Sequence, residues 1–414
     1  MIQSSLPLDD ILEALDLSRA EPGIGFLQAL FERFIARVPF ENASKIARDA
    51  TVAERDEKPR RPEIFWSDHL ERGAGGTCFA RVAAMEALLA SLGFPARKVL
   101  GRVERDFDHA ALVVSHGGQT WICDVGFPLP ALVAPAAGRI ETALMDLDVS
   151  VTPRGHRVDF RAGVPEGPRG LEIFEQEVSD EEFFERWRMT FSPGSRFLSE
   201  VVLRRQDPVR VVSYARGEVR VDDRHCRLRV PLPPPRAPRL AELFGIDAAL
   251  LTDATVRVPD RDAREPRGSL AAYLETAASP EAAFSALSSP SAYRRFIEGV
   301  GAVKSITELP EGWRLTLAPP AGEQGADPII EEVVALSDRR TLKIRRMTAG
   351  RTFDSELRAE DRGGRTYLIR EAFFEASRED LLRNDSLRGR LAGSLAVDLL
   401  AWTRLLAPAR DLSA

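Results

Sequence analysis

The stretch Gly75-Gly76-Thr77-Cys78-Phe79 is the part of the sequence from which the fold can be read. A glycine pair precedes the cysteine, and residues 79–92 carry apolar side chains at helical spacing until Gly93. Glycine directly after such a run is a common helix stop. The pattern therefore predicts Cys78 at the N-terminus of a helix.

Two segments further along, His109 and Asp124 are expected to meet. His109 precedes the apolar run Ala110-Ala111-Leu112-Val113-Val114, and Asp124 follows Thr120-Trp121-Ile122-Cys123. The turn Ser115-His116-Gly117-Gly118 separates the two runs, which is typical of a β-hairpin. The hairpin would place both side chains on one face.

Cysteine, histidine and aspartate together suit nucleophilic catalysis. A thiol is a strong nucleophile as the thiolate, which a helix N-terminus and a neighbouring imidazolium both favour. A carboxylate on the other ring nitrogen fixes the imidazole tautomer. We therefore expect Cys78 as nucleophile, His109 as base and Asp124 as its orienting partner. Cys123 and Cys226, and the other histidines, lack such a context.

The order of these motifs resembles the arylamine N-acetyltransferase family. The resemblance rests on Gly-Gly-x-Cys-Phe, on Asp124-Val125-Gly126-Phe127, on Val38-Pro39-Phe40-Glu41-Asn42 upstream and on residues 240–246 downstream. It implies a helical start, a β-barrel and an α/β lid, the cysteine-proteinase-like fold of that family, over residues 1–252. It also implies substrate or coenzyme contacts, listed here: Phe40, Thr77, Phe79, Val103, Gly126 and Phe127.

Several positions depart from the family pattern. Ala74 precedes the glycine pair where the family has arginine, and Ala80 and Val82 replace its glutamate and asparagine. Pro128 follows Phe127 where glycine is usual, which removes a backbone donor near the expected coenzyme A site. The resemblance implies that Glu41 pairs with an arginine near the cysteine loop, and Arg72 is the nearest arginine in the sequence. The alternative is that Glu41 is a solvated charge without such a partner.

Composition limits the other possibilities. A chain of 414 residues exceeds what one core usually supports, so two domains are expected. The net charge of −6 disfavours nucleic acid as the main partner. Three cysteines indicate a reducing compartment. The acidic N-terminus and the lack of a run of ~20 apolar residues predict a cytoplasmic protein without a signal or membrane span. No metal motif occurs.

The fold class predicted is α+β, with helix over residues 8–37, strands at 97–103, 109–115 and 119–125, and a β-rich region at 150–231 that includes a strand at 197–204. Residues 253–268 are charged and contain proline, which is typical of a linker. Residues 269–414 then give a strand, a helix capped by Ser279, six further strands and a long apolar-faced helix. This order resembles the helix-grip fold of the START and polyketide-cyclase (SRPBCC) superfamily. That resemblance implies an apolar ligand; a structural or dimerising domain with a filled core is the alternative.

The function expected is acyl transfer from acetyl-CoA, or another acyl-CoA, to a small-molecule amine through a Cys78 thioester, by a ping-pong mechanism. One alternative is an amide synthase or amidohydrolase that applies the same three residues to another acyl donor. The other is a non-enzymatic small-molecule-binding protein with a relic triad. The sequence leaves open the donor, the acceptor and the oligomeric state.

Overall fold

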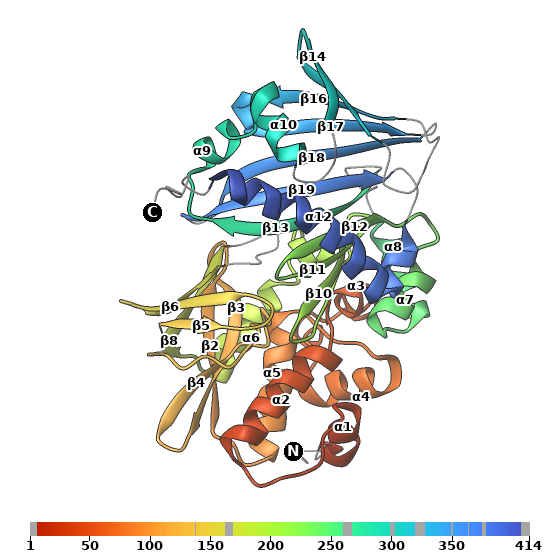
Figure 1. Cartoon of the computed structure of the whole chain (residues 1–414). Helices are drawn as coiled ribbons and strands as arrows, with labels where there is room; N and C mark the ends of the chain where they lie inside the picture. The colour runs from red at the N-terminus through yellow and green to blue at the C-terminus, as the bar shows by residue number, and fades with distance from the viewer. Residues whose placement is uncertain are drawn as a thin grey trace. The chain divides into compact units, whose positions relative to one another are not determined.

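The computed structural model describes residues 6–136, 138–161, 169–259, 267–298, 303–318, 328–348, 351–362, 364–374 and 378–406. The chain divides into two compact units, one of residues 1–224 and 232–264 and the other of residues 225–231 and 265–414. Figure 1 shows their helices and strands. Among the described residues, no helix combines the length and hydrophobicity that a membrane span needs.

The first unit begins with helices and continues mainly with strands. Its helices are α1 (Leu8–Ala14), α2 (Ile24–Arg37), α3 (Ala43–Thr51), α4 (Pro62–Arg72), α5 (Cys78–Ser91), α6 (Asp180–Met189), α7 (Ala237–Phe244) and α8 (Ala248–Arg257), with short 3-10 turns η1 (Arg55–Glu57) and η2 (Arg196–Leu198). Its strands are β1 (Phe40–Glu41), β2 (Ala96–Arg102), β3 (Asp106–His116), β4 (Gln119–Cys123), β5 (Arg139–Glu141), β6 (Asp146–Thr152), β7 (Gly155–Phe160), β8 (Gly170–Glu177), β9 (Val202–Gln206), β10 (Arg210–Ala215) and β11 (Glu218–Asp223).

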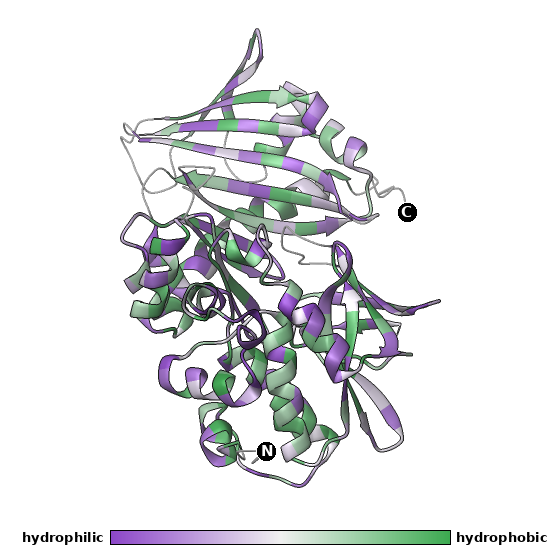
Figure 2. Ribbon diagram, turned by 180° about the vertical axis from the view of Figure 1, so that it is seen from behind, coloured by the Kyte–Doolittle hydropathy of each residue, from purple (hydrophilic) through white to green (hydrophobic). Residues whose placement is uncertain are grey.

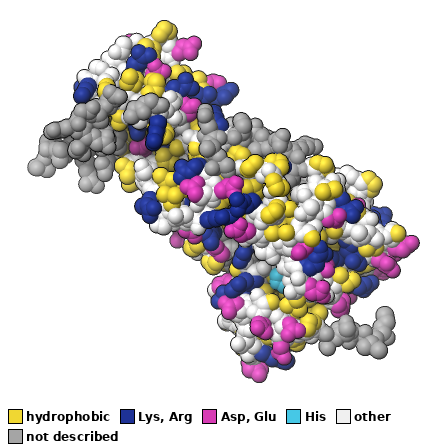
Figure 3. Space-filling view, turned by 90° about the vertical axis from the view of Figure 1, so that its right-hand side faces the viewer, with side chains coloured by type: hydrophobic (Ala, Val, Ile, Leu, Met, Phe, Trp, Pro, Cys, Tyr) yellow, Lys and Arg dark blue, Asp and Glu magenta, His cyan; other side chains and the backbone are white. Residues whose placement is uncertain are grey.

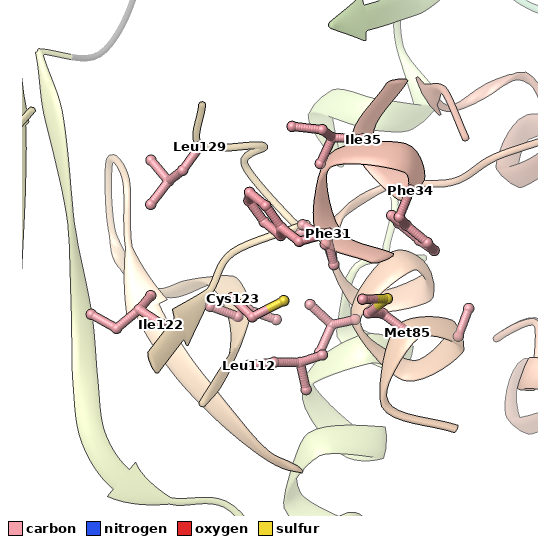
Figure 4. Packing of buried hydrophobic residues seen from close by; sticks show 14 of the residues in the cluster. Phe31, Phe34, Ile35, Met85, Leu112, Ile122, Cys123 and Leu129 are labelled. Atoms are coloured by element: carbon pink, nitrogen blue, oxygen red, sulfur yellow. The ribbon is translucent and has the colours of Figure 1, made fainter. Parts of the chain in front are cut away.

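Two antiparallel strand sets organise this unit. One is a seven-stranded sheet in the order β4-β3-β2-β8-β7-β6-β5, and the other runs β1-β9-β10-β11. Helix α5 packs against β2 and β3 of the seven-stranded sheet. The core between them is apolar: Phe31 and Phe34 from α2 meet Met85, Leu112 and Cys123 (Figure 4). The sheet therefore holds the start of α5 in a fixed position.

The second unit is one antiparallel sheet with helices. The sheet has the order β12-β13-β19-β18-β17-β16-β15-β14. Its strands are β12 (Cys226–Pro231), β13 (Gly268–Thr276), β14 (Val303–Leu309), β15 (Gly312–Leu317), β16 (Ile329–Leu336), β17 (Thr341–Thr348), β18 (Arg351–Asp361) and β19 (Thr366–Phe374). Its helices are α9 (Pro280–Ser285), α10 (Pro290–Glu298), α11 (Glu379–Arg383) and α12 (Asp385–Leu406), with the 3-10 turn η3 (Ser337–Arg339).

The long helix α12 packs on β13 and β19 of this sheet (Figure 1). Trp402 of α12 is buried, and its indole nitrogen donates to the carbonyl of Ala283 at 3.0 Å. Hydrophobic and hydrophilic residues alternate along the strands (Figure 2), as expected where one face of a sheet covers a core. The six strands expected after residue 300 and the cap of α9 by Ser279 agree with the structure.

Three expectations from the sequence were wrong in detail. The helix expected over residues 8–37 is two helices, because Pro22 and Gly23 interrupt the pattern before α2. The strand expected at 197–204 begins only at Val202, after the 3-10 turn η2. Residues 253–257, expected within a linker, belong to α8, where Ala254 is buried. Most of the remaining linker lies outside the described residues.

The strand β12 lies before the expected boundary at residue 252 but pairs with β13. Its residues Leu228 and Val230 are buried, and residues 225–231 group with the second unit. The limits 1–252 and 269–414 remain a proposal.

Candidate active site

Cys78 is the first residue of α5 and is 7% exposed. The first N–H groups of a helix have no partner within the helix, so they point toward a group placed at its start. Arg81 makes the first backbone bond of the helix, to Thr77. The sulfur of Cys78 therefore lies where the partial positive charge of the helix N-terminus favours an anion.

The loop before Cys78 is held from several sides. Gly76 donates its N–H to Pro39 at 3.3 Å and accepts from the N–H of Glu41 at 3.2 Å. The imidazole of His69 contacts the carbonyl of Ala74 at 3.0 Å. A side chain at Gly75 would collide with the carbonyl oxygen of Pro39, at 1.7 Å from an added Cβ. Only glycine fits at position 75.

Arg60, and not Arg72, is the arginine beside this loop. Its guanidinium donates to the carbonyl of Gly75, pairs with Asp68 at 2.8 Å and lies 3.7 Å from the carboxylate of Glu41. Arg72 instead pairs with Asp247 at 3.5 Å on the surface. The expected pairing of Glu41 with Arg72 was therefore wrong, and so was the alternative of a solvated charge, because Glu41 is fully buried.

His109 and Asp124 meet as the hairpin predicts. Leu112 of β3 is paired with Cys123 of β4, which brings His109 and Asp124 to the same end of the hairpin. His109 Nε2 lies 2.7 Å from Asp124 Oδ2. The other carboxylate oxygen accepts the N–H groups of Gly126 and Phe127, each at 2.9 Å. The carboxylate is thus fixed by three hydrogen bonds.

Gly126 lies between Cys78 and the imidazole. A Cβ added there would be 3.0 Å from Cβ of Cys78 and 3.1 Å from Cε1 of His109. Because Nε2 of His109 faces Asp124, Nδ1 is the ring nitrogen left for the neighbouring Cys78. The structure therefore brings all three residues together.

The electrostatics favour a charged imidazole. Burial lowers the pKa of His109, but the Asp124 carboxylate and the hydrogen bond and charge of Cys78 outweigh it, and together they raise the pKa to about 10. Burial acts in the opposite direction on the thiol of Cys123, the residue before Asp124, and raises its pKa strongly. Cys123 lies among Phe31 and Leu112 in the core (Figure 4), where a thiol is inert.

The remaining residues that the resemblance implied fall into two groups. Thr77 and Phe79 are buried, and Phe79 packs on Phe183 of α6 with ring centroids 5.2 Å apart. Half-buried side chains make up the second group: Phe40, Val103 and Phe127. Phe40 contacts Phe197 at 5.5 Å, and Phe127 stacks on Phe160 at 5.3 Å. Val103 follows β2, and its N–H donates to Asp108 at 2.8 Å.

Sequence reasoning missed the buried arginine Arg81. Its Nε donates to the carbonyl of Val125 at 2.6 Å, and a second nitrogen donates to the carbonyl of Val38. Within the part of the chain that the structure describes, Nη2 has no hydrogen-bond partner. Burial lowers its pKa to about 9, against the charges of Asp124, Glu41 and Cys78. Arg81 thus ties α5 to the segment that carries Asp124. The signal in the sequence was a charged residue in the first turn of an otherwise apolar helix.

Pro128 lies in the turn that follows Asp124 and is buried. The carbonyl of Asp124 accepts the N–H of Leu129 at 3.2 Å, so the turn closes beyond the proline. The departure from the family pattern therefore leaves the geometry at Asp124 intact and removes one N–H from this loop.

Among the residues that the structure describes, no group of three His, Cys, Asp or Glu side chains is arranged to hold a metal ion. On the face that Figure 3 shows, Lys and Arg side chains are intermingled with Asp and Glu.

Comparison with known proteins gives the class of fold. The N-acetyltransferase family model Acetyltransf_2 matches residues 24–145. No curated protein is significantly similar in sequence. The arylamine N-acetyltransferase of M. tuberculosis superposes with a TM-score of 0.51 at 19% identity, covering 61% of this chain and 100% of its own.

Two further structures are similar. The Mycobacterium marinum arylamine N-acetyltransferase, solved in complex with CoA, gives a TM-score of 0.51 at 18% identity and covers 60% of this chain and 95% of its own. The Bacillus cereus enzyme is described as having a Cys-His-Glu catalytic triad. Its structure gives a TM-score of 0.50 at 19% identity and covers 58% of this chain and 98% of its own. These likenesses show that the N-terminal part has the arylamine N-acetyltransferase fold.

Proposed function

We propose that this protein is an acyl-CoA-dependent N-acyltransferase that works through an acyl thioester on Cys78. The observation that carries the proposal is the arrangement of Cys78 at a helix N-terminus beside His109, whose Nε2 lies 2.7 Å from Asp124. The match of residues 24–145 to the N-acetyltransferase family supports it. So does the fold shared with a relative solved in complex with CoA.

The first half of the reaction forms the thioester. His109 holds the proton of the Cys78 thiol, and the thiolate attacks the carbonyl carbon of the acyl donor. Free N–H groups at the start of α5 stabilise the oxyanion that develops. The bond from the carbonyl carbon to the donor sulfur breaks, and His109 returns its proton to the departing thiol. Cys78 is then acylated, and the net proton balance is zero.

The second half transfers the acyl group to an amine. A neutral amine, aromatic in the simplest case, attacks the thioester carbon while His109 takes its proton. Cys78 leaves as the thiolate beside the imidazolium, and the amide is released. Asp124 keeps the imidazole in the tautomer and orientation that both halves require. Phe40 and Phe127, which are half-buried, are proposed to contact the substrates.

An amide synthase or amidohydrolase with another acyl donor is the second candidate. The observation that favours it is Pro128, which lacks an N–H in the loop where the family resemblance expects a glycine near coenzyme A. Steady-state kinetics with acetyl-CoA and aniline test the two functions. Parallel double-reciprocal lines are expected of the ping-pong transferase. Reaction only with thioesters of other carriers, or hydrolysis without amide formation, would favour the second candidate.

The role of the second unit is a separate proposal. We propose that it is a helix-grip domain, because its strand, two short helices, antiparallel strands and long closing helix occur in that order. Tyr293 is buried in contact with Phe296 and Trp313, so aromatic side chains fill this part of the core and favour the alternative of a structural domain. Titration of the full chain with an apolar fluorescent probe tests this. Saturable binding supports a ligand site, and its absence supports the structural role.

A further inference from the structure

Lys45 of α3 is a buried ammonium that forms no ion pair with a carboxylate of the described residues. It is 5% exposed, and its Nζ donates to the hydroxyl of Thr190 at 2.7 Å and lies 4.6 Å from the centre of the Phe191 ring. A buried charge without a counterion destabilises a fold. This residue plays no part in the mechanism above.

The segments around Lys45 also contact the segment that carries Cys78. The strand β1, directly before α3, is joined to the Cys78 loop by the pairing of Phe40 with Gly76. Thr190 follows α6, the helix whose Phe183 packs on Phe79. Burial lowers the pKa of Lys45 to about 8, while the negative charges of Cys78 and Asp49 oppose that fall. An anion on a substrate bound at Cys78 would therefore find a desolvated cation nearby.

We propose that Lys45 binds a carboxylate on the acyl group that Cys78 accepts, so that the preferred donor is the monothioester of a dicarboxylic acid, of the malonyl or succinyl class. The inference rests on the proposed acyl transfer. The carboxylate takes no part in the chemistry. The donor carbon–sulfur bond breaks, the Cys78 thioester forms, and the donor thiol leaves with the proton from His109.

The acyl group fits Lys45 better than the acceptor amine does. The amine must approach beside His109, because His109 takes its proton. His109 is on β3 of the β3–β4 hairpin, and its ring lies close to Gly101 and Gly126, where an added Cβ would be 3.3 and 3.1 Å from ring atoms. Lys45 comes from α3, on the side of Thr190 and Phe191. A substituent of the acyl carbon that points away from the imidazole would approach the ammonium.

The test compares two donors that differ only in charge. Full-length protein is mixed with succinyl-CoA or with the similarly long butyryl-CoA, and the rate of Cys78 acylation is measured by rapid quench and intact-protein mass spectrometry. Lys45→Met is expected to lower the ratio of the two rates by at least ~10-fold, the scale of a lost charge-assisted hydrogen bond. Lys45→Arg should restore part of the ratio.

Lys98 provides the matched control. It is a half-buried lysine that lies 5.4 Å from the Phe183 ring, but it is paired with Glu86 and Asp180. Lys98→Met should leave the ratio within ~2-fold of the wild-type value, since it changes no unpaired charge. If Lys45→Met does not fold, Thr190→Val removes the hydroxyl that orients Nζ and should lower the same ratio.

Each other outcome overturns the inference. Equal rates for both donors in the wild type contradict it, and so does an equal loss for both donors in Lys45→Met, which would make Lys45 a general oxyanion stabiliser. A variant that instead changes the preference for para-aminobenzoate over aniline, with butyryl-CoA as donor, would place the carboxylate on the acceptor. Absence of any adduct with either donor would overturn the acyl-transfer function itself.

Discussion

His109 Nε2 and Asp124 Oδ2 lie 2.7 Å apart, although the residues come from two successive segments separated by a hairpin turn. Gly126 and Phe127 hold the second carboxylate oxygen, each at 2.9 Å. The carboxylate therefore cannot rotate freely, and it presents one oxygen to the ring. This leaves Nδ1 of His109 for Cys78, which is the orientation that the proposed mechanism needs.

Asp124→Asn should reduce acyl transfer by about 10³–10⁴-fold, because an amide can favour the wrong imidazole tautomer while keeping the geometry. The measurement is kcat/KM for amide formation, with circular dichroism to verify the fold. A loss of less than ~10-fold in a folded variant would show that Asp124 only closes the turn after β4.

Alkylation of Cys78 should be fast at neutral pH. A free thiol reacts with iodoacetamide in step with its thiolate fraction, which rises around pH ~8.5. The pKa of His109, raised to about 10, keeps an imidazolium beside the sulfur across this range. The rate at pH 7 should therefore be within about 3-fold of the rate at pH 9.

The control for alkylation is His109→Ala, which should recover the steep profile of a free thiol. A wild-type profile with its midpoint near pH ~8.5 would contradict the ion pair. Cys123 and Cys226 are both buried, and peptide mapping distinguishes their products from that of Cys78.

The same histidine should make stability depend on pH. Its folded pKa of about 10 lies above the ~6.5 of an unfolded chain, so protonation favours the folded state. The stabilisation is complete below pH ~6.5 and is lost as pH rises through about 10. The fall in Tm between pH 6.5 and 10 should therefore be smaller in His109→Gln than in wild type. Identical slopes in calorimetry would refute this coupling.

Arg60 and Arg72 should differ in their effect on stability. Arg60 is buried and contacts Asp68, Gly75 and Glu41, so Arg60→Met leaves the buried charge of Glu41 unpaired and should cost about 3–5 kcal/mol. Arg72→Met breaks a half-exposed pair with Asp247 and should cost about 0–1 kcal/mol, since solvent screens it. Urea unfolding measures both. Equal losses would contradict the assignment of Arg60 to the cysteine loop.

The sequence predicted the parts of the site that depend on local patterns. A glycine pair before an apolar helical run placed Cys78 at the start of α5, and the glycine turn between two apolar runs placed His109 and Asp124 on one hairpin. These features follow from backbone preferences over short distances. The same is true of β13 to β19 in the second unit, whose number and order agree with the expected ones.

The sequence could not predict contacts that depend on packing between distant segments. Arg60 lies in the segment before α4, and only the packing of that helix brings it to Gly75 and Glu41. The sequence around Lys45 gives no sign of burial, which follows from the packing of α3 against Thr190. The strand β12 escaped notice because its partner, β13, begins about forty residues later.

The central claim is that Cys78 carries the acyl group, and the mass of the intact protein after exposure to acyl-CoA without an amine tests it most directly. The account predicts one acyl adduct per chain, mapped by peptide analysis to Cys78, absent from Cys78→Ala and discharged by an aromatic amine. Iodoacetamide labelling of Cys78 verifies that the thiol is reactive in the same sample. A reactive, folded protein that gains no acyl group, or gains it equally in Cys78→Ala, would contradict the account.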